Sequence, residues 1–306
     1  MVMHASTLPA VLSPVLTPFT VDGDPDLVKF EHQCRWLQNN GVGLAVFGTN
    51  SEANSLSAKQ KLQALEHLIK KGIPADQMMP GTGACSVAEA TEMTRFAVDL
   101  GCAGVLMLPP FYYKDVSDDG LFSYFAKVIE KVASSNLQVY IYNIPPVVKF
   151  GLSVALLERL VKAYPHTVVG MKDSSGDWTY TEACIKGLAP LGFRVYAGSE
   201  TFLLKTLRAG GVGCISATAN VNPKAISKLA ANWQASDADQ KQAELDQVRA
   251  VFAKYPMIAS MKSAVAHYSQ DLNWERLLPP LINLPQSAQE TLFAELRGIN
   301  FSMPGL

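Results

Sequence analysis

Short apolar runs alternate with amphipathic stretches along most of the chain. Eight runs have the length of buried strands and comprise residues 11–17, 43–48, 78–83, 104–109, 138–143, 168–172, 193–198 and 213–217. Between them, apolar residues recur at helical spacing in residues 27–39, 57–71, 86–100, 119–133, 154–164, 180–191 and 200–208. Strands that alternate with helices favour a parallel sheet, and eight such units favour its closure. The pattern therefore predicts an α/β fold, a (β/α)8 TIM barrel.

The strand pattern stops at Pro223, and helical stretches follow in residues 240–252, 259–268 and 288–296. We expect residues 1–222 to form the barrel that carries the active site. Residues 223–306 then supply the last barrel helix and a C-terminal helical extension within the same structural unit. A doubly wound open sheet is the alternative fold, but no Gly-x-Gly-x-x-Gly motif follows the first strand.

Composition excludes several classes of partner. The 306 residues are 48% hydrophobic and 17% charged, with a net charge of −1, so we expect neither nucleic acid nor an anionic membrane as a partner. No apolar run approaches the length of a membrane span, and residues 1–6 lack the pattern of a secretion signal. The five cysteines are scattered, which is typical of reduced thiols in a cytoplasmic protein. The five histidines form no ligand pattern, so we expect no metal.

Polar residues follow most of the predicted strands directly. They lie in residues 48–52, 109–114, 140–146, 172–177, 198–200 and 216–220. In barrels of this type the active site forms at the carboxyl ends of the strands. These side chains are therefore expected to converge on one pocket.

Lys172 ends the apolar run that begins at residue 168, and the polar turn 173–177 follows at once. A lysine at the point where the chain leaves a core loses hydration, which makes the neutral, nucleophilic amine easier to reach. Schiff-base chemistry needs such an amine. The alternative is a lysine at a strand end that simply reaches solvent.

Two further groups accompany this lysine. Residues 48–51 can form a nest of backbone N–H groups for a carboxylate, although an ordinary polar loop before a helix capped by Ser57 is the alternative. Tyr142 and Tyr140 face the same side of a regular strand, and Tyr142 lies nearer the carboxyl end. Tyr142 is therefore placed to transfer protons near Lys172, unless it is a core tyrosine with a satisfied hydroxyl.

Taken together, these motifs resemble those of the dihydrodipicolinate synthase/N-acetylneuraminate lyase family from about residue 12 to residue 280. The matching motifs are Gly48-Thr49-Asn50-Ser51-Glu52, Pro110-Phe111-Tyr112-Tyr113, Tyr142-Asn143-Ile144-Pro145, Gly170-Met171-Lys172-Asp173-Ser174-Ser175-Gly176-Asp177 and Ser216-Ala217-Thr218-Ala219-Asn220. The resemblance implies a barrel enzyme that forms an imine between its lysine and a 2-keto acid, usually pyruvate, without an external cofactor. It also implies a homotetramer built as a dimer of dimers.

The resemblance assigns catalytic roles to four residues. Lys172 matches the Schiff-base lysine, and Tyr142 matches the tyrosine that transfers protons at the imine. Thr49 matches the threonine that links this tyrosine to another from a neighbouring subunit, and Tyr113 is the better match for that second tyrosine.

The resemblance also assigns substrate-binding positions. Asn50 and Ser51 match the clamp for the keto-acid carboxylate, and Ile215 matches the apolar residue beside the bound keto acid. The loop of Gly198 and Glu200 matches the one that offers carboxylates to sugar hydroxyls in sialic-acid lyases, of which only Glu200 is retained.

The departures from the family pattern bear on the substrate. The synthases carry an arginine for the acceptor carboxylate where this chain has Val147, and the lyases carry a serine where it has Ala217. We therefore predict a Schiff-base-forming lyase or aldolase that acts on pyruvate or a 2-keto-3-deoxy sugar acid. One alternative is a true 4-hydroxy-tetrahydrodipicolinate synthase that uses another cation, such as Lys149. A catalytically silent keto-acid-binding barrel and a phosphate-binding isomerase barrel are alternatives from other classes, and aldol cleavage and dehydration both remain open.

Overall fold

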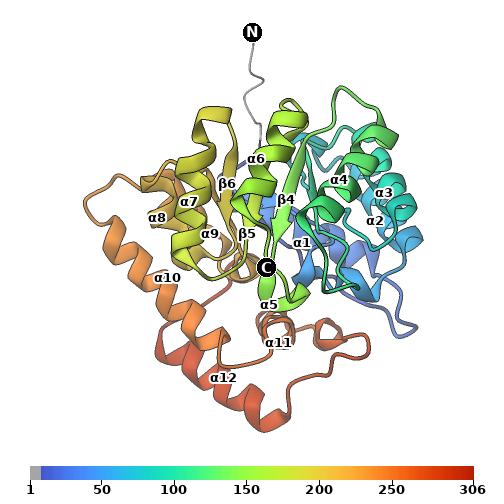
Figure 1. Cartoon of the computed structure of the whole chain (residues 1–306). Coiled ribbons are helices and arrows are strands. Elements are labelled where there is room, and N and C mark those ends of the chain that lie inside the picture. The colour runs from blue at the N-terminus through green and yellow to red at the C-terminus, as the bar shows by residue number, and fades with distance from the viewer. Residues whose placement is uncertain (1–7) are drawn as a thin grey trace.

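Seven parallel strands form the centre of the computed structural model, which describes residues 8–306 (Figure 1). They are β1 (Val11–Ser13), β2 (Gly43–Leu44), β3 (Val105–Met107), β4 (Val139–Asn143), β5 (Val168–Asp173), β6 (Arg194–Ala197) and β7 (Gly213–Ile215). Their hydrogen-bonded order is β2-β1-β7-β6-β5-β4-β3. The predicted absence of a secretion signal concerns residues 1–6, which lie outside the described range.

The third predicted strand, residues 78–83, is irregular and closes the barrel. Single parallel bridges pair this segment with Leu44 of β2 and Leu106 of β3. The amide of Met79 donates to the Leu44 carbonyl at 2.8 Å, and the amide of Leu106 donates to the Pro80 carbonyl at 2.9 Å. Pro80 has no N–H to donate, so a continuous ladder cannot pass through it. The prediction of a regular third strand is wrong, whereas the closed eight-unit barrel is confirmed.

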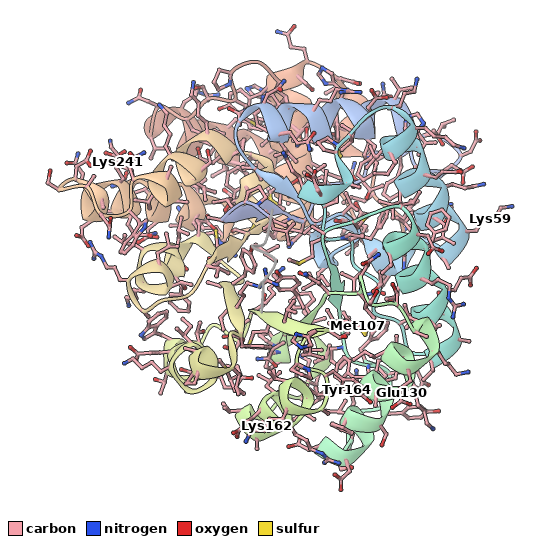
Figure 2. The ribbon with its side chains drawn as sticks, turned by 90° about the horizontal axis from the view of Figure 1, so that it is seen from above. Lys59, Met107, Glu130, Lys162, Tyr164 and Lys241 are labelled. Atoms are coloured by element: carbon pink, nitrogen blue, oxygen red, sulfur yellow. The ribbon has the colours of Figure 1, made fainter. Side chains whose placement is uncertain are left out.

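Helices surround this barrel. They are α1 (Leu27–Asn39), α2 (Ala58–Lys70), α3 (Val87–Asp99), α4 (Asp118–Val132), α6 (Val154–Ala163), α7 (Trp178–Leu188), α8 (Leu203–Arg208) and α9 (Pro223–Ala231). In the view from above, the side chains of Lys59, Lys162 and Lys241 project outward from the helices, whereas Met107 lies within the ring and is fully buried (Figure 2).

Most of these helices begin where the sequence supplies a cap. Ser57, Ser86, Ser117, Ser153 and Asp177 each accept an N–H from the first turn that follows. Each such cap stabilises its helix by about 1 kcal/mol. The caps place several helix starts a residue or two away from the predicted ones, and the predicted helix 200–208 divides into a short 3-10 turn, η5 (Glu200–Phe202), and α8.

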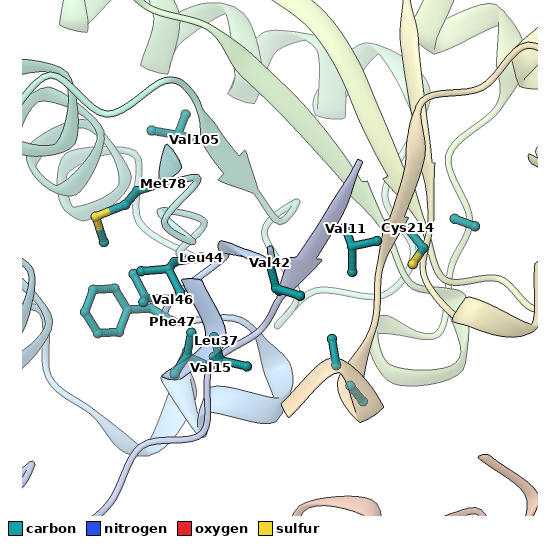
Figure 3. Packing of buried hydrophobic residues seen from close by; sticks show 14 of the residues in the cluster. Val11, Val15, Leu37, Val42, Leu44, Val46, Phe47, Met78, Val105 and Cys214 are labelled. Carbon is teal, nitrogen blue, oxygen red and sulfur yellow. The ribbon is translucent and has the colours of Figure 1, made fainter. Parts of the chain in front are cut away.

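The apolar side chains form two layers. Between the strands and the helices, Leu44, Met78 and Val105 pack with other aliphatic residues (Figure 3). Inside the barrel, a smaller cluster contains Tyr140 and Tyr196, whose ring centroids lie 5.8 Å apart in an edge-to-face arrangement. Such an aromatic pair adds about 1 kcal/mol beyond its buried area. The interior is therefore filled, and substrate can enter only at an end of the barrel.

Three further helices form the C-terminal extension: α10 (Ala238–Phe252), α11 (Met257–Ser269) and α12 (Gln286–Gly298). They lie beside and below the barrel in Figure 1. α11 contacts the short 3-10 turns η1 (Thr49–Ser51) and η6 (Ala217–Asn220), which follow β2 and β7. The extension therefore reaches the carboxyl ends of the strands. Within residues 8–306, no helix is long and apolar enough to cross a membrane.

Candidate active site

Lys172 and Tyr142 lie side by side at the carboxyl ends of two adjacent strands. They are register partners between β4 and β5, and Lys172 pairs with Tyr196 of β6 on its other side. The Lys172 side chain is only 2% exposed, and its Nζ lies 4.3 Å from the centroid of the Tyr142 ring. The interpretation of Lys172 as a lysine that simply reaches solvent is therefore wrong.

A β-bulge aims Lys172 into the barrel. The pairing of β4 with β5 shifts between Val139 and Tyr140, so Val169 has no register partner and Gly170 pairs with Tyr140. A Cβ at Gly170 would lie 2.7 Å from the Tyr140 ring, so this position faces the interior and admits only glycine. Lys172 is two residues further along and points to the same side.

Thr49 completes a group of polar side chains around the phenol of Tyr142. Its hydroxyl lies 3.4 Å from the Tyr142 hydroxyl, a long hydrogen bond between η1 and β4. Burial by itself raises the pKa of Tyr142, but the positive charge of Lys172 and hydrogen bonds from Thr49, Ser174 and Lys172 outweigh it, so the pKa lies below its usual value. A phenol with a lowered pKa loses and regains its proton more easily, as a general acid–base group must.

The turn that carries Asn50 and Ser51 is fixed by its own hydrogen bonds. The Ser51 hydroxyl accepts from the Gly48 amide at 3.1 Å, and the Ser51 carbonyl accepts from the Thr17 hydroxyl at 2.6 Å. Glu52, which ends this turn, adopts the left-handed conformation with φ of 56°. For a residue other than glycine, that conformation costs about 1 kcal/mol or more. A hydroxyl that accepts one hydrogen bond still has a proton to donate, so Ser51 can also bind a carboxylate.

The carboxylate of Asp173 ties the ends of β4 and β5 together, and sequence reasoning missed this role. One oxygen accepts from Asn143 Nδ2 at 2.8 Å and from the Ser175 amide at 3.0 Å. The other accepts from the hydroxyls of Ser175 and Thr181 at 2.8 and 2.5 Å. Asp173 and Asn143 directly follow Lys172 and Tyr142 in their strands, so this network holds Lys172 and Tyr142 in register.

Gly198 lies against the same site for a steric reason. Its amide donates to the Asp173 carbonyl at 2.6 Å, and a Cβ at this position would lie 2.0 Å from the hydroxyl oxygen of Ser174. Ser174 is one of the partners of Tyr142. Only glycine therefore allows β6 to approach the turn that supports the phenol.

Glu200 is buried, but its carboxylate already has partners. It accepts hydrogen bonds from the hydroxyls of Ser216 and Thr218, and it lies 3.5 Å from Arg249 of α10. Its side chain is 1% exposed. The structure thus places Glu200 in a satisfied network between η5, η6 and the extension, where few lone pairs remain for a sugar hydroxyl. Ile215, fully buried in β7, belongs to the cluster inside the barrel.

Tyr113 is not brought to this group within one chain. It is 73% exposed and makes an edge-to-face contact with Tyr112, with ring centroids 5.3 Å apart. In the part of the chain that the structure describes, no hydrogen bond joins Tyr113 to Thr49 or Tyr142. The alternative acceptor cation, Lys149, is exposed and donates to the Pro146 carbonyl at 2.7 Å.

A small cavity of about 20 Å³ lies beside Thr49 and Tyr142. Gly81 and Gly83 of the irregular third strand line it. A Cβ at Gly81 would lie 2.2 Å from the carbonyl oxygen of Phe47, so a larger residue cannot occupy this wall. The cavity therefore adjoins the side chains of Thr49 and Tyr142, and Lys172 is not among the residues that line it.

A larger cavity, of about 750 Å³, lies elsewhere, between α9, α10 and residues 299–302. It contains none of the predicted site residues. We locate the candidate site at Lys172 because the buried amine, the phenol and the carboxylate network converge there. Among the described residues, no group of three or more histidine, cysteine, aspartate or glutamate side chains is placed to hold a metal ion.

Comparison with known proteins agrees with this geometry. Residues 7–298 match the model of the dihydrodipicolinate synthetase family. The chain is 30% identical over 283 residues to an uncharacterized DapA-like lyase of Chloroflexus aurantiacus, covering 92% of each chain. It is also 30% identical over 293 residues to a 4-hydroxy-tetrahydrodipicolinate synthase of Acidiphilium cryptum, covering 93% of this chain and 96% of that one.

A solved structure extends the comparison. A prophage protein of the dihydrodipicolinic acid synthase family from E. coli K12, in complex with pyruvate, superposes with a TM-score of 0.86 at 26% identity. The match covers 96% of this chain and 99% of that one. The family predicted from the motifs is therefore confirmed. The chain belongs to the dihydrodipicolinate synthetase family and is an enzyme of the lyase class.

Proposed function

We propose that this protein is a class I lyase that forms an imine between Lys172 and a 2-keto acid, either pyruvate or a 2-keto-3-deoxy sugar acid, without an external cofactor. One observation carries the proposal: the amine of Lys172 is buried and lies 4.3 Å from the ring of Tyr142. Burial keeps competing water away from the amine, and the phenol supplies the proton transfers that imine formation requires.

The reaction follows from these two groups. The neutral amine of Lys172 attacks the keto carbon, the carbonyl oxygen takes up a proton from Tyr142, and loss of water gives a protonated imine. In the cleavage direction, the Tyr142 phenolate removes the proton of the substrate hydroxyl at C4. The C3–C4 bond then breaks and its electron pair moves into the imine. The fragment beyond C3 leaves as an aldehyde whose carbonyl carbon is the former C4. Tyr142 then gives the proton it removed to C3 of the enamine, and hydrolysis of the imine releases pyruvate and restores the lysine.

The substrate carboxylate is bound by the turn after β2. In this proposal Asn50 and Ser51 donate hydrogen bonds to it, and Thr49 orients the phenol of Tyr142 through their 3.4 Å contact. Ile215 supplies an apolar surface beside the keto acid, and Gly198 leaves room for the turn that supports Tyr142. The pyruvate bound in the E. coli relative supports pyruvate as the donor.

The far end of the substrate is less anionic than the acceptor of a synthase. Val147 is 51% exposed at the position where the synthases carry an arginine, and valine cannot form a bidentate contact with a carboxylate. Glu200 contributes to the shape of this end through Ser216 and Thr218. Because one relative is named as a 4-hydroxy-tetrahydrodipicolinate synthase, that synthesis is the second candidate function. Lys149 would then be the cation that binds the carboxylate of the acceptor.

A second copy of the chain completes the proton relay in this proposal. The exposed pair Tyr112–Tyr113 offers two aromatic rings to a neighbouring subunit, and a phenol from that subunit would reach Thr49. The proposed assembly is therefore at least a dimer, and the family resemblance favours a cytoplasmic tetramer of two dimers.

Borohydride trapping with pyruvate tests the imine. Reduction should fix a pyruvyl adduct on the peptide that contains Lys172, readable by intact mass and peptide mapping, and Lys172→Ala should abolish it. Tyr142→Phe should form the adduct about 100-fold more slowly, because it lacks the acid–base group. The matched control is Lys61→Met, which removes another buried lysine, in α2, and should trap as the wild type does. Absence of an adduct with pyruvate and with every longer 2-keto acid would refute the proposal.

A further inference from the structure

Glu52 belongs to the motif of the carboxylate turn, yet the proposed mechanism does not use it. It directly follows Ser51, between η1 and η2 (Ala53–Ser55), and it is 3% exposed. Its backbone is in the left-handed conformation. A strained backbone and a buried carboxylate next to a substrate-binding turn indicate that this side chain is held for a purpose.

The partner of Glu52 comes from the C-terminal extension. The carboxylate forms an ion pair with Lys262 of α11, and both side chains are fully buried. The Leu278 amide donates to Glu52 Oε2 at 3.2 Å, and the Lys262 ammonium donates to the Arg276 carbonyl at 2.7 Å. The ammonium also lies 4.3 Å from the centroid of the Phe19 ring. The turn is thus fastened both to α11 and to the chain segment that follows it.

A buried ion pair is a weak source of stability, because the cost of removing both charges from water offsets their attraction. Its best-attested role is to specify one arrangement among several. A salt bridge needs its two partners at one distance and one orientation, whereas apolar contacts tolerate sliding. Because Glu52 is covalently next to Ser51, its position also determines where Asn50 and Ser51 point.

We propose that the Glu52–Lys262 pair is a positioning device that holds the turn 49–51 in the geometry that binds the substrate carboxylate, so that the C-terminal extension is part of the active site. This inference rests on the proposed function, in which that turn binds the keto acid. Neither Glu52 nor Lys262 touches the substrate.

The test replaces both charges at once. Glu52→Gln/Lys262→Met keeps side chains of similar size and leaves no charge unpaired, so the protein should fold. Leu292→Ala is the control, because Leu292 is fully buried in α12 and its truncation loosens the extension without altering the turn. If the double variant does not fold, Glu52→Gln alone replaces it, since the single amide oxygen of glutamine still accepts from Lys262 while its amide nitrogen faces the Leu278 N–H.

Two measurements follow for each variant. The first is hydrogen exchange of the peptide covering residues 48–56 in the ligand-free protein. The second is the pyruvate concentration that gives half-maximal borohydride trapping at Lys172, compared with the amount trapped at saturation. In the double variant we expect faster exchange and a half-saturating concentration about tenfold higher, with saturation unchanged, because the turn no longer holds the carboxylate in place. Glu52→Gln alone should give about a threefold rise, and Leu292→Ala less than about twofold.

The outcomes separate this inference from the proposed function. Unchanged exchange of residues 48–56, or wild-type half-saturation, in the double variant overturns the inference while leaving the imine mechanism intact. Equal effects in Leu292→Ala also overturn it, because general loosening would then explain them. If the wild type traps no keto acid, the proposed function fails and the inference about the substrate fails with it. The exchange measurement still decides whether the ion pair fixes the turn.

Discussion

Replacing Asp173 with asparagine tests how far one carboxylate holds β4 and β5 in register. Its two oxygens accept four hydrogen bonds, from Asn143, from the amide and hydroxyl of Ser175, and from Thr181. The amide nitrogen of the new asparagine is a donor, so it cannot face Asn143 Nδ2 or the backbone N–H of Ser175, which are donors too. It must face the hydroxyls of Ser175 and Thr181, which can rotate and accept from it.

The magnitude follows from the change in these four bonds. A hydrogen bond to a charged group contributes about 1.5–3 kcal/mol and a neutral one about 0.5–1.5, so each bond weakens by about 1 kcal/mol. Because the bonds share one carboxylate they are not additive, and we expect the free energy of unfolding to fall by about 3 kcal/mol. Looser register between the strands should also slow borohydride trapping at Lys172 by about tenfold.

Urea unfolding at a fixed protein concentration measures the change in the free energy of unfolding. The slope of this free energy against urea concentration should be equal in the wild type and the variant, which shows that unfolding exposes the same surface in both. Asp119→Asn is the control, since Asp119 is 83% exposed and pairs with Arg159 at the surface, where the loss should stay below about 1 kcal/mol. The double variant Asp173→Asn/Thr181→Val should lose less free energy of unfolding than the sum of the losses in the two single variants. A loss below about 0.5 kcal/mol in Asp173→Asn, or strict additivity with Thr181→Val, would refute the shared-network argument.

Two further predictions concern the phenol and a glycine beside it. The pKa of Tyr142 lies below 10 in the wild type, and in Lys172→Met it should rise because burial then dominates, as ultraviolet titration of the phenolate can measure. Since the folded-state pKa lies below the unfolded value, this group adds stability as pH rises toward 10 and loses that contribution as pH falls through the folded pKa. Gly170→Ala should destabilise by about 2 kcal/mol or more, because the new Cβ would lie 2.3 Å from the Arg194 carbonyl oxygen. Gly187→Ala, with open space around the new methyl in α7, should instead stabilise by about 0.5 kcal/mol.

These two predictions have clear counter-results. Tyr142→Phe supplies the blank for the ultraviolet titration, and an unchanged Tyr142 pKa in Lys172→Met would show that the lysine charge does not reach the phenol. Thermal or urea unfolding compares the two glycine variants, and equal stability of both would contradict the steric argument for the interior face of β5.

Local patterns in the sequence predicted the barrel and the central pair of the site. The period of two along a strand assigned Tyr140 and Tyr142 to one face, with Tyr142 nearer the carboxyl end, and the break from apolar to polar residues assigned Lys172 to a strand end. Both assignments depend on neighbours within a few residues. The third strand shows the limit of such patterns, because Pro80 lies within an apolar run but interrupts its ladder.

The partners of the polar groups could not be predicted in the same way. Glu52 pairs with Lys262, and Glu200 is satisfied by Ser216, Thr218 and Arg249. The residues next to either carboxylate in the sequence do not predict these partners, because the partners lie in distant helices and turns. A buried charge must find a compensating group, but which group it finds depends on how the helices pack.

The sequence by itself thus determined the alternation of strands and helices, the family, and the choice of Lys172 and Tyr142 as the central pair of the candidate site. The periodicity of apolar residues, and the alternation of side chains between the two faces of a strand, are local properties that can be recognised in consecutive residues. The tertiary structure alone decided that Asp173 joins two strand ends, that Glu200 is already satisfied, and that α11 reaches the carboxylate turn. The reason is that contacts between distant segments depend on packing geometry, which no stretch of neighbouring residues specifies.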